Sequence, residues 1–594
     1  MEPIKVDFTG GNSGNERGSG KTAYLTPSKS GLKIILSLIA TVIGGAIAYY
    51  FMLPAINIKS TDFYMYLGVL LAIFVGAITV LSGAMKSPEY TPYVKKVSRV
   101  PFIIAAVLVA VFAVGTVVSS TVLRAGSYSK LVSVDETKSF STDIEEANFQ
   151  SVPVLDRYAS AALANRALGD LASVNLVSQF EVSAFPTDST QINYKNSPVR
   201  VTTLAYGDVF KWFKNTKDGF PGYIIVNMVT QKSELVMMEK GNYIKYSTQE
   251  HFGKYLMRHI RFKYPTYLLD APHFEIDESG KPYWLCPVMD NTIGLFGGRD
   301  VIGLILVDAV TGECFEYSIE EVKTNKALQW IDVIYSESLL VEQYNYHGKL
   351  SNGFINSVIG QEGVKIATEG SNFLAINDDV YMYTGVTSAG GDQAIIGFVL
   401  VNMRTKEANF YTVSGAKEYS AKDSAEGAVQ DYKYTATFPI LLNISGQPTY
   451  FMSLKDSSNL VKRFAMVNVQ NYQVVVTGET IASCTEAYVK SLKQNNINIK
   501  VDLDKIESET DSSQTEPKPE TETKKTKGVV ADIRTAVMGG ESIYFIKLEG
   551  KDIYFTISAS DEQSVVILNK GDEITVEYED TKGKKVEAVS VKLR

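Results

Sequence analysis

The first 125 residues contain three long apolar runs, whereas the rest of the chain alternates short apolar and polar segments. The runs Ile34–Ile56, Phe63–Met85 and Val100–Leu123 contain no acidic or basic residue. Each is close to the ~20 residues that cross a hydrocarbon core of ~30 Å. A surface helix of a soluble domain would carry a polar stripe at the helical period, and these runs carry none. The pattern predicts three transmembrane helices within residues 31–124.

The basic residues around these runs predict how the helices are oriented. They gather before the first run and between the second and the third, at Arg17, Lys21, Lys29, Lys33, Lys86, Lys95, Lys96 and Arg99. The loop between the first two runs holds only Lys59, which Asp62 balances. Because positively charged loops stay in the cytoplasm, we expect a flexible cytoplasmic tail at 1–30 and insertion in the cell membrane. Everything after residue 124 is then extracytoplasmic.

The three predicted helices lack the features of a transport pathway. Transporters place charged residues or broken helices near the middle of the membrane, and the apolar runs contain no charged residue. Small residues let transmembrane helices approach closely, and Gly44, Gly45, Gly68 and Gly76 are candidates for such contacts. We therefore expect the helices to act as an anchor.

Beyond the membrane segment, one short pattern recurs four times. An apolar strand ends in Asn or Asp, and Thr or Asn follows three residues later. These repeat-turn positions are Asn227 and Thr230, Asp308 and Thr311, Asn402 and Thr405, and Asn468 and Asn471. A short polar side chain at the end of a strand can bond to the backbone of the following turn. Asn at three of the four positions disfavours acid–base catalysis and strong calcium binding, which require carboxylates.

Each repeat is predicted to be a small antiparallel meander beside a helix. An aromatic strand precedes the pattern, and the helices are predicted at Asp156–Ala172, Thr248–Phe262 and Ala421–Gln430. The segment Lys281–Tyr317, with Val307-Asp308-Ala309-Val310-Thr311-Gly312-Glu313 at its centre, resembles a PepSY-type domain. The resemblance implies an α+β extracytoplasmic domain of repeated PepSY-like units over 201–495, after a helical and extended region at 125–200.

The same resemblance implies a function. PepSY-type domains are non-catalytic modules of protease propeptides and envelope proteins, where they inhibit or bind a partner. The whole chain also resembles membrane proteins of Gram-positive bacteria, a similarity that implies no particular activity.

The C-terminal part of the chain predicts a separate small module. Residues 507–527 are dominated by Glu, Thr, Ser, Lys and Pro, which is typical of a disordered linker. Residues 528–594 contain five short predicted strands, at Val529–Val537, Ser542–Leu548, Asp552–Ile557, Ile574–Tyr578 and Val586–Leu593. Five strands in so short a segment resemble an OB-like β-barrel. Nine Lys/Arg against twelve Asp/Glu in this segment give a net charge of −3, which disfavours nucleic acid as the ligand.

Composition narrows the chemistry further. The net charge is −8, and the chain has 34 tyrosines but only four histidines. These histidines, His251, His259, His273 and His347, do not have the spacing of metal ligands. The motif Gly18-Ser19-Gly20-Lys21-Thr22 imitates a P-loop, but Asn15 replaces the first glycine that a P-loop needs. Of the three cysteines, Cys286 and Cys314 fall in neighbouring predicted strands, so one disulfide between them stays an alternative. Buried free thiols are the favoured interpretation. We predict no catalytic residue, no cofactor and no metal.

Together these features predict a membrane-anchored, non-catalytic binding, regulatory or scaffold protein of the cell envelope that has a protein partner. Two alternatives stay open. One is an envelope enzyme that acts on wall polymer or peptide through residues that converge only in three dimensions. The other is an accessory subunit of a membrane transport or secretion complex. Homo-oligomerisation also stays open.

Overall fold

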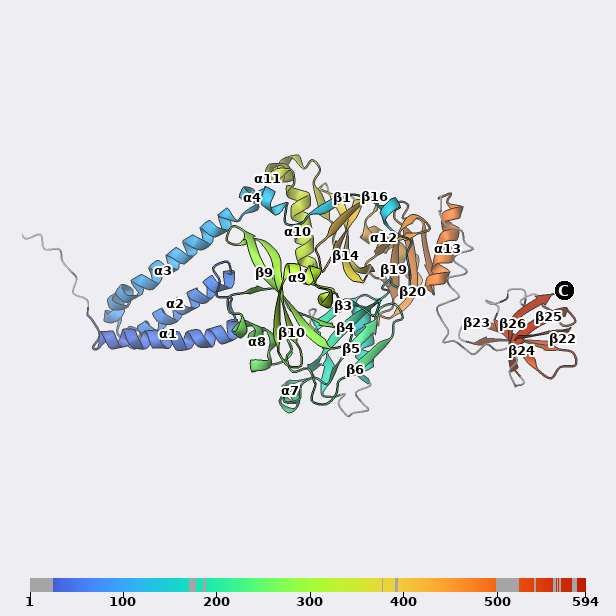
Figure 1. The fold of residues 1–594 in the computed structure, drawn as a ribbon, viewed down its shortest axis with the longest axis horizontal. Coiled ribbons are helices and arrows are strands. Elements are labelled where there is room, and N and C mark those ends of the chain that lie inside the picture. Colours follow the sequence, from blue (N-terminus) through green and yellow to red (C-terminus); the bar gives the residue numbers. More distant parts are fainter. Residues whose placement is uncertain are drawn as a thin grey trace, which may run out of the picture. The chain divides into compact units, whose positions relative to one another are not determined.

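The computed structural model describes residues 25–593 except 170–177, 185–187, 377, 390–393, 498–522, 539–540, 559–561, 563–564, 566–567 and 580–584. The chain divides into two compact units, residues 1–500 and residues 501–594, whose elements Figure 1 labels. The predicted tail up to residue 24 and the predicted linker up to residue 522 lie outside the described residues.

Three helices of the first unit are long and apolar enough to span a membrane. They are α1 (Ser30–Met52), α2 (Thr61–Ser82) and α3 (Thr91–Val118), with the short η1 (Pro88–Tyr90) before α3. The glycines divide into two classes. A Cβ on Gly45 would lie 2.5 Å from Leu70 of α2, so this glycine lets α1 and α2 pack closely, whereas a Cβ on Gly68 or Gly76 would meet nothing within 4 Å. Only the first pair of predicted contact residues, Gly44 and Gly45, lies in a helix interface.

The third spanning helix ends earlier than its apolar run. The run extends to Leu123, but α3 ends at Val118 and a second helix, α4 (Thr121–Tyr128), follows. Ser120 has extended backbone angles of φ −70° and ψ 150°, which break the helix. The Ser119 hydroxyl accepts hydrogen bonds from the N–H groups of Leu295 and Phe296. Bonds to a distant hairpin, rather than a change in hydrophobicity, therefore mark the end of α3.

Four sheets follow, and they share one strand order: two short strands pair with successive parts of one long strand, and two further strands continue the antiparallel meander. The first sheet contains β2 (Phe180–Val182), β3 (Ser189–Tyr194), β4 (Ser197–Tyr206), β5 (Gly222–Asn227) and β6 (Ser233–Met237). The second contains β7 (Leu268–Leu269), β8 (His273–Ile276), β9 (Pro282–Ile293), β10 (Gly297–Asp308) and β11 (Cys314–Ser318).

The third and fourth sheets repeat this order, and the third gains one parallel strand, β1 (Val134–Ser139), beside β16. The third contains β12 (Lys365–Ala367), β13 (Asn372–Ile376), β14 (Asp379–Ser388), β15 (Ala394–Asn402) and β16 (Ala408–Ala416). The fourth contains β17 (Thr435–Ala436), β18 (Ile440–Ile444), β19 (Gln447–Lys455), β20 (Val461–Asn468) and β21 (Val475–Gly478). The first sheet begins before residue 200, so the predicted boundary between 125–200 and 201–495 cuts through it.

A helix precedes each sheet. These helices are α6 (Arg157–Ala167), α8 (Leu256–Lys263), α10 (Glu337–Leu350) and α12 (Glu418–Gly427). Further described helices and turns are α5 (Phe140–Asp143), α7 (Val209–Asn215), η4 (Phe252–Lys254), α9 (Ile319–Thr324), η5 (Lys326–Leu328), α11 (Gly353–Ile355), η6 (Asn356–Gly360), η7 (Gln430–Tyr432) and α13 (Ile481–Gln494). The predicted helix Thr248–Phe262 is wrong in its first half, because Tyr255 is extended and the helix begins only at Leu256.

One set of backbone bonds occurs in all four sheets. In each sheet, the residue after the capping Asn or Asp donates its backbone N–H to a carbonyl at the beginning of the long strand. The carbonyl of the same residue accepts a backbone N–H from the segment that leads into the sheet. The residues that do this are Met228, Ala309, Met403 and Val469. The same two kinds of backbone hydrogen bond therefore hold the turn of each meander against its long strand and against the segment that leads into the sheet.

The long central strands supply much of the core. Trp284 of β9, Tyr383 of β14 and Tyr450 of β19 are among the largest fully buried side chains. The apolar cluster around them is continuous across the four sheets, with a second cluster where α9 and α10 cover the second and third sheets. Burial of apolar surface contributes ~25 cal/mol per Å², so these strands fix how the sheets pack.

The second unit is a closed barrel in which β22 pairs with both β23 and β25, and β24 pairs in parallel with β26. Its strands are β22 (Thr523–Met538), β23 (Glu541–Leu548), β24 (Tyr554–Ser558), β25 (Glu573–Glu579) and β26 (Lys585–Leu593). They correspond to the five predicted strands. The first strand starts five residues before the predicted domain boundary at 528, because Thr523–Val529 pair with β25.

Candidate functional site

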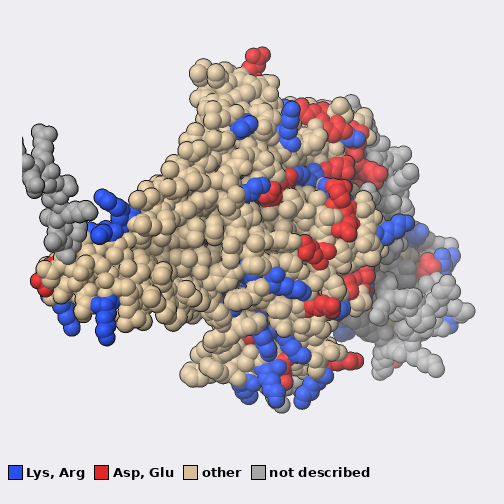
Figure 2. Space-filling view, turned by 60° about the vertical axis from the view of Figure 1, so that its left-hand side comes forward, with Lys and Arg blue, Asp and Glu red and all other residues tan. Residues whose placement is uncertain are grey.

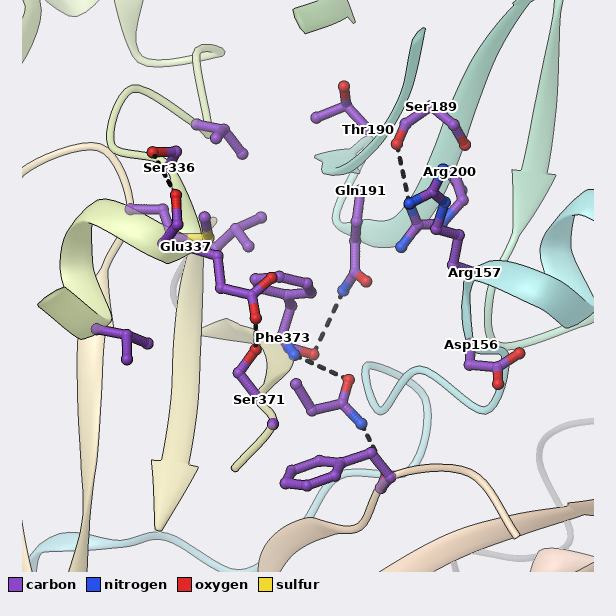
Figure 3. A pocket seen from close by; sticks show the side chains of 18 of the residues that line it. Asp156, Arg157, Ser189, Thr190, Gln191, Arg200, Ser336, Glu337, Ser371 and Phe373 are labelled. Atoms are coloured by element: carbon purple, nitrogen blue, oxygen red, sulfur yellow. Dashed lines mark hydrogen bonds between the residues drawn. The ribbon is translucent and has the colours of Figure 1, made fainter. Parts of the chain in front are cut away.

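A cleft of about 1540 Å³ lies among the sheets of the first unit, and all four sheets line it. Its walls come from β3 and β4 of the first sheet, β8 and β9 of the second, β13 and β14 of the third, and β17 and β19 of the fourth. The beginnings of α6 and α10 also face it, and Figure 3 shows part of the lining.

One wall of the cleft carries two arginines. Arg200 lies in β4, where its backbone pairs with Gln191 of β3 and Val226 of β5, so its side chain leaves the plane of the sheet. Arg157 is the first residue of α6. Figure 3 shows the two side chains next to each other on the same wall. The wall therefore presents two positive charges.

Arg200 is buried without an acidic partner. Only 7% of the residue is exposed, and among the described residues no carboxylate lies within ion-pair distance of its guanidinium. Nη1 donates to the carbonyl of Ser189 at 3.0 Å, and Nε has no partner. Burial, and to a smaller extent the positive charge of Arg157, lower the pKa of Arg200 to about 10, so the group is still charged at neutral pH. Buried charges in proteins are normally paired or bound to a ligand.

The nearest acidic group is already neutralised. Asp156 caps α6 by accepting the N–H of Ala159 at 2.8 Å, and its other oxygen binds the ammonium of Lys455 at 2.5 Å. Lys455 is itself buried. Since this carboxylate is occupied by a lysine, it cannot compensate the arginines fully, and the wall keeps a net positive charge.

The opposite wall is acidic and belongs to the start of α10. The Glu337 carboxylate accepts the hydroxyl of Ser371, and the Ser336 hydroxyl donates to Asp270 at 3.1 Å. Asp270 also binds Arg299 at 2.8 Å. Figure 3 shows Glu337 across the cleft from Arg200. The cleft thus has a basic wall and an acidic wall.

Amide and aromatic side chains lie between the two walls. The Gln191 amide donates to the carbonyl of Phe373 at 3.3 Å, and the Asn372 amide donates to the carbonyl of Phe438 at 2.9 Å. Both phenylalanines line the cleft. Flat apolar surface with a few oriented polar groups is typical of ligand-binding sites. An extended chain with polar backbone groups, such as a peptide or a glycan, suits such a lining.

The eight predicted repeat-turn residues lie elsewhere, two in each of four hairpins, and the first of each pair is the capping Asn or Asp. Each side-chain oxygen accepts two backbone N–H groups at 2.8–3.1 Å, from the residues two and three positions later. These bonds are made by Asn227, Asp308, Asn402 and Asn468, to turns that end at Thr230, Thr311, Thr405 and Asn471. The structure does not bring these residues together, and none of the eight lines the cleft.

Asp308 differs from its three counterparts because it also binds a cation. Its second oxygen lies 2.6 Å from the ammonium of Lys281. Burial alone would raise the pKa of Asp308, but hydrogen bonds from Lys281 and from the N–H groups of Thr311 and Val310 hold it below its usual range. The carboxylate is therefore fully compensated within the chain.

One cysteine and one histidine lie close together, because the Cys314 Sγ is 3.7 Å from Nε2 of His259. Burial raises the pKa of the Cys314 thiol, which disfavours the reactive thiolate. Cys286 and Cys314 are free, and they lie on strands that flank β10 on opposite sides. Burial raises the pKa of Cys286 to about 12, which suppresses its reactivity. Among the described residues no group of three His, Cys, Asp or Glu side chains is placed to hold a metal ion.

A buried carboxyl group lies close behind the cleft. Asp332 accepts the N–H of Asn193 at 2.7 Å, and its own N–H donates to the buried carboxylate of Glu275. Burial and the nearby charge of Glu275 raise the pKa of Asp332 well above its usual range. Because Asn193, Glu275 and Asp332 come from the first sheet, the second sheet and the segment before α10, this carboxyl joins three parts of the domain.

Sequence reasoning missed the cleft residues, although one signal existed. Arg200 interrupts an otherwise apolar and Thr-rich strand, Val199-Arg200-Val201-Thr202-Thr203-Leu204. A charge in the middle of a central strand is unusual and requires a partner or a ligand. Glu337 carries no comparable signal, because acidic residues are favoured in the first turn of a helix.

Comparison with known proteins adds no family: no protein-family model and no curated protein matches this chain.

Proposed function

We propose that this chain is a membrane-anchored, non-catalytic binding protein of the cell envelope, and that the central cleft holds part of its partner. The observation that carries the proposal is the buried and charged Arg200 in the wall of the cleft, which has no acidic partner among the described residues. A partner that places a carboxylate or phosphate against Arg200 and Arg157 would provide the missing counter-charge. Its extended part would lie over the amides and aromatic rings between the two walls.

The orientation of the chain belongs to this proposal. The basic residues that flank the apolar runs keep one end of the spanning helices in the cytoplasm. The β-rich domain follows the other end of α3, so the cleft faces the outside of the cell. An extracytoplasmic location of the domain excludes cytoplasmic nucleic acid as the partner and favours an envelope protein.

The two parts of the chain support a modular arrangement. The common strand order and common turn bonds of the four sheets support PepSY-like repeats. The barrel order β22-β23-β24-β26-β25, with one parallel pair, supports an OB-like module. Both are modules that other proteins use for binding, which agrees with a regulatory or scaffold role.

Photo-crosslinking in intact cells tests the proposal. Benzoylphenylalanine would replace Tyr158, a largely exposed residue that lines the cleft, and in a separate variant Tyr472, which is half exposed and does not line it. We expect irradiation to attach an envelope component to position 158 and not to position 472. In a strain that carries Arg200→Met, this adduct should be lost. Identical adducts at both positions, or an adduct at 158 that survives Arg200→Met, would contradict cleft binding.

A further inference from the structure

The domain touches the spanning helices at the level where they leave the membrane. Arg258 and Arg261 of α8 donate through Nε to the carbonyls of Tyr50 and Leu53, at 3.1 and 3.0 Å, in the last turn of α1 and just after it. The ring of Phe262 lies 5.6 Å from the ring of Tyr49. Lys59, in the loop between α1 and α2, binds Asp290 of β9 at 2.7 Å. These contacts seat α8 and β9 directly on the helix ends.

The tip of the β9–β10 hairpin reaches below the end of α3. The ring of Phe296 lies 5.1 Å from that of Phe112 and 5.5 Å from that of Tyr64. Phe112 is about 9 Å from the end of α3 along the helix axis, at ~1.5 Å per residue. A Cβ on Gly115 would lie 2.7 Å from the Phe296 ring, so this glycine makes room for it. The hairpin tip therefore lies between α2 and α3 at membrane depth.

Beside the end of α3, an aliphatic tip is exposed. Ile355 of α11 is 73% exposed and Ile359 of η6 is 80% exposed, and the segment 353–360 contains no charged residue. Its base is fixed, because Phe354 packs on Tyr128 of α4. Since α4 begins three residues after α3 ends, this aliphatic tip lies next to the membrane exit.

Beside the end of α1, an aromatic and basic tip is exposed. Phe210 and Phe213 of α7 are 80% and 68% exposed. Lys211, which also pairs with Asp208 at 3.1 Å, and Lys214 lie beside them. The carbonyl of Phe252, whose ring lies 5.7 Å from Trp212 of α7, accepts Nη1 of Arg258. Arg258 in turn contacts α1, so this aromatic tip is tied to the other membrane exit. Aromatic and basic residues on one short element are typical of the headgroup layer.

We propose that the domain rests on the lipid surface through these two tips, with the aromatic tip of α7 bound to anionic headgroups. The surface is continuous with the spanning helices: Figure 2 shows uncharged surface running from the helices onto the adjoining part of the domain. Lipid contact removes the exposed apolar side chains from water, and basic residues near an anionic surface strengthen the attachment. The cleft is thereby held at a fixed height and orientation above the membrane. This inference does not depend on the proposed ligand of the cleft.

Depth-dependent fluorescence quenching of the full chain in liposomes tests it. The label NBD would be attached to Ile359→Cys, to Phe210→Cys, and to a control, Tyr472→Cys, at the turn between β20 and β21. The native Cys286 and Cys484 are buried, so only Cys314 needs replacement by alanine. Liposomes would contain phosphatidylcholine alone, or phosphatidylcholine with about 30 mol% phosphatidylglycerol, which provides an anionic surface. The quenchers would be brominated lipid and aqueous iodide.

We expect brominated lipid to quench labels 359 and 210 at least twofold more than label 472, and iodide to quench them less. Anionic lipid should increase lipid quenching at 210, and Lys211→Glu with Lys214→Glu should abolish that increase. Iodide quenching at 359 and 210 equal to that at 472 would overturn the inference. Shielding that is retained in detergent and depends on protein concentration would overturn it too, because a second copy would then cover the tips.

Discussion

Two buried charges in the first unit have opposite surroundings. Asp308, at the end of β10, accepts two backbone N–H groups and binds Lys281. Arg200, in the middle of β4, makes one hydrogen bond and has no acidic partner among the described residues. The two sheets have the same strand order, but Arg200 lies in the long strand of its sheet, whereas Asp308 ends the strand that follows the long one. The charge of Asp308 is compensated within the chain and serves the fold, whereas the charge of Arg200, which no described carboxylate compensates, is where we propose that the partner binds.

The largest effect is expected where the compensated charge is removed. Asp308→Ala leaves the N–H groups of Val310 and Thr311 and the half-exposed Lys281 ammonium without their acceptor. The loss of two hydrogen bonds to a charged group should lower the free energy of unfolding by ~3 kcal/mol. Thermal unfolding of the full chain in detergent would measure this loss. Asp308→Asn is the control, because the other three sheets carry Asn here and keep both turn bonds. Equal losses for Ala and Asn would show that the turn bonds contribute nothing.

The equivalent capping residue of the first sheet, Asn227, binds no cation and should contribute less to the free energy of unfolding. Asn227→Ala in the first sheet removes the two turn bonds and the bond that the Asn227 amide donates to the Ser197 hydroxyl, but no ion pair, so we expect a loss of ~1 kcal/mol. The ratio between this loss and that of Asp308→Ala measures what Lys281 adds. A loss for Asn227→Ala as large as that for Asp308→Ala would remove the distinction between the two caps.

The pH dependence of stability should have opposite signs at two buried acids. The pKa of Asp308 is held low, so its contribution is present above the ordinary carboxyl pKa of ~3.9 and is lost as the pH falls through its folded value. The pKa of Asp332 is raised, so the folded state keeps a proton that the unfolded state releases above pH ~3.9, and stability falls as the pH rises.

Urea unfolding at several pH values from ~4 to ~8, all above the ordinary carboxyl pKa of ~3.9, would separate the contributions of the two acids. Asp332→Asn should remove part of the fall in stability with rising pH, whereas Asp308→Asn should leave that fall unchanged. An unchanged slope in Asp332→Asn would mean that its carboxyl is ionised in the folded chain.

The smallest effect on stability is expected at the uncompensated charge. Arg200→Met removes a desolvated charge and keeps an unbranched side chain of similar length, so the lost bond to Ser189 and the relieved burial cost should nearly cancel. We expect the free energy of unfolding to change by less than ~1 kcal/mol. A loss of ~3 kcal/mol, as expected for Asp308→Ala, would show that Arg200 is compensated and serves the fold.

Much of the architecture follows from local sequence signals, and the cleft does not. Uncharged apolar runs indicate the spanning helices, and the Asn or Asp at the end of each strand indicates the hairpins, because both signals act over a few residues. The end of α3 depends on bonds between Ser119 and a hairpin 176 residues away, so hydrophobicity alone places it too late. The cleft joins Arg200 of the first sheet and Glu337 of helix α10, and only the packing of the sheets and helices brings them to one cavity.

The central claim is that Arg200 awaits an acidic group, and ligand-dependent stabilisation tests it most directly. Thermal unfolding of the full chain would be followed at constant ionic strength with increasing inorganic phosphate or a hexaglutamate peptide in place of chloride. A ligand at ~100 times its Kd stabilises the folded state by ~2.7 kcal/mol. We predict a saturable rise in Tm with at least one of the two probes, retained in the control Lys462→Met and abolished in Arg200→Met. An equal rise in Arg200→Met, or no rise in the unmodified chain with either probe, would contradict the account.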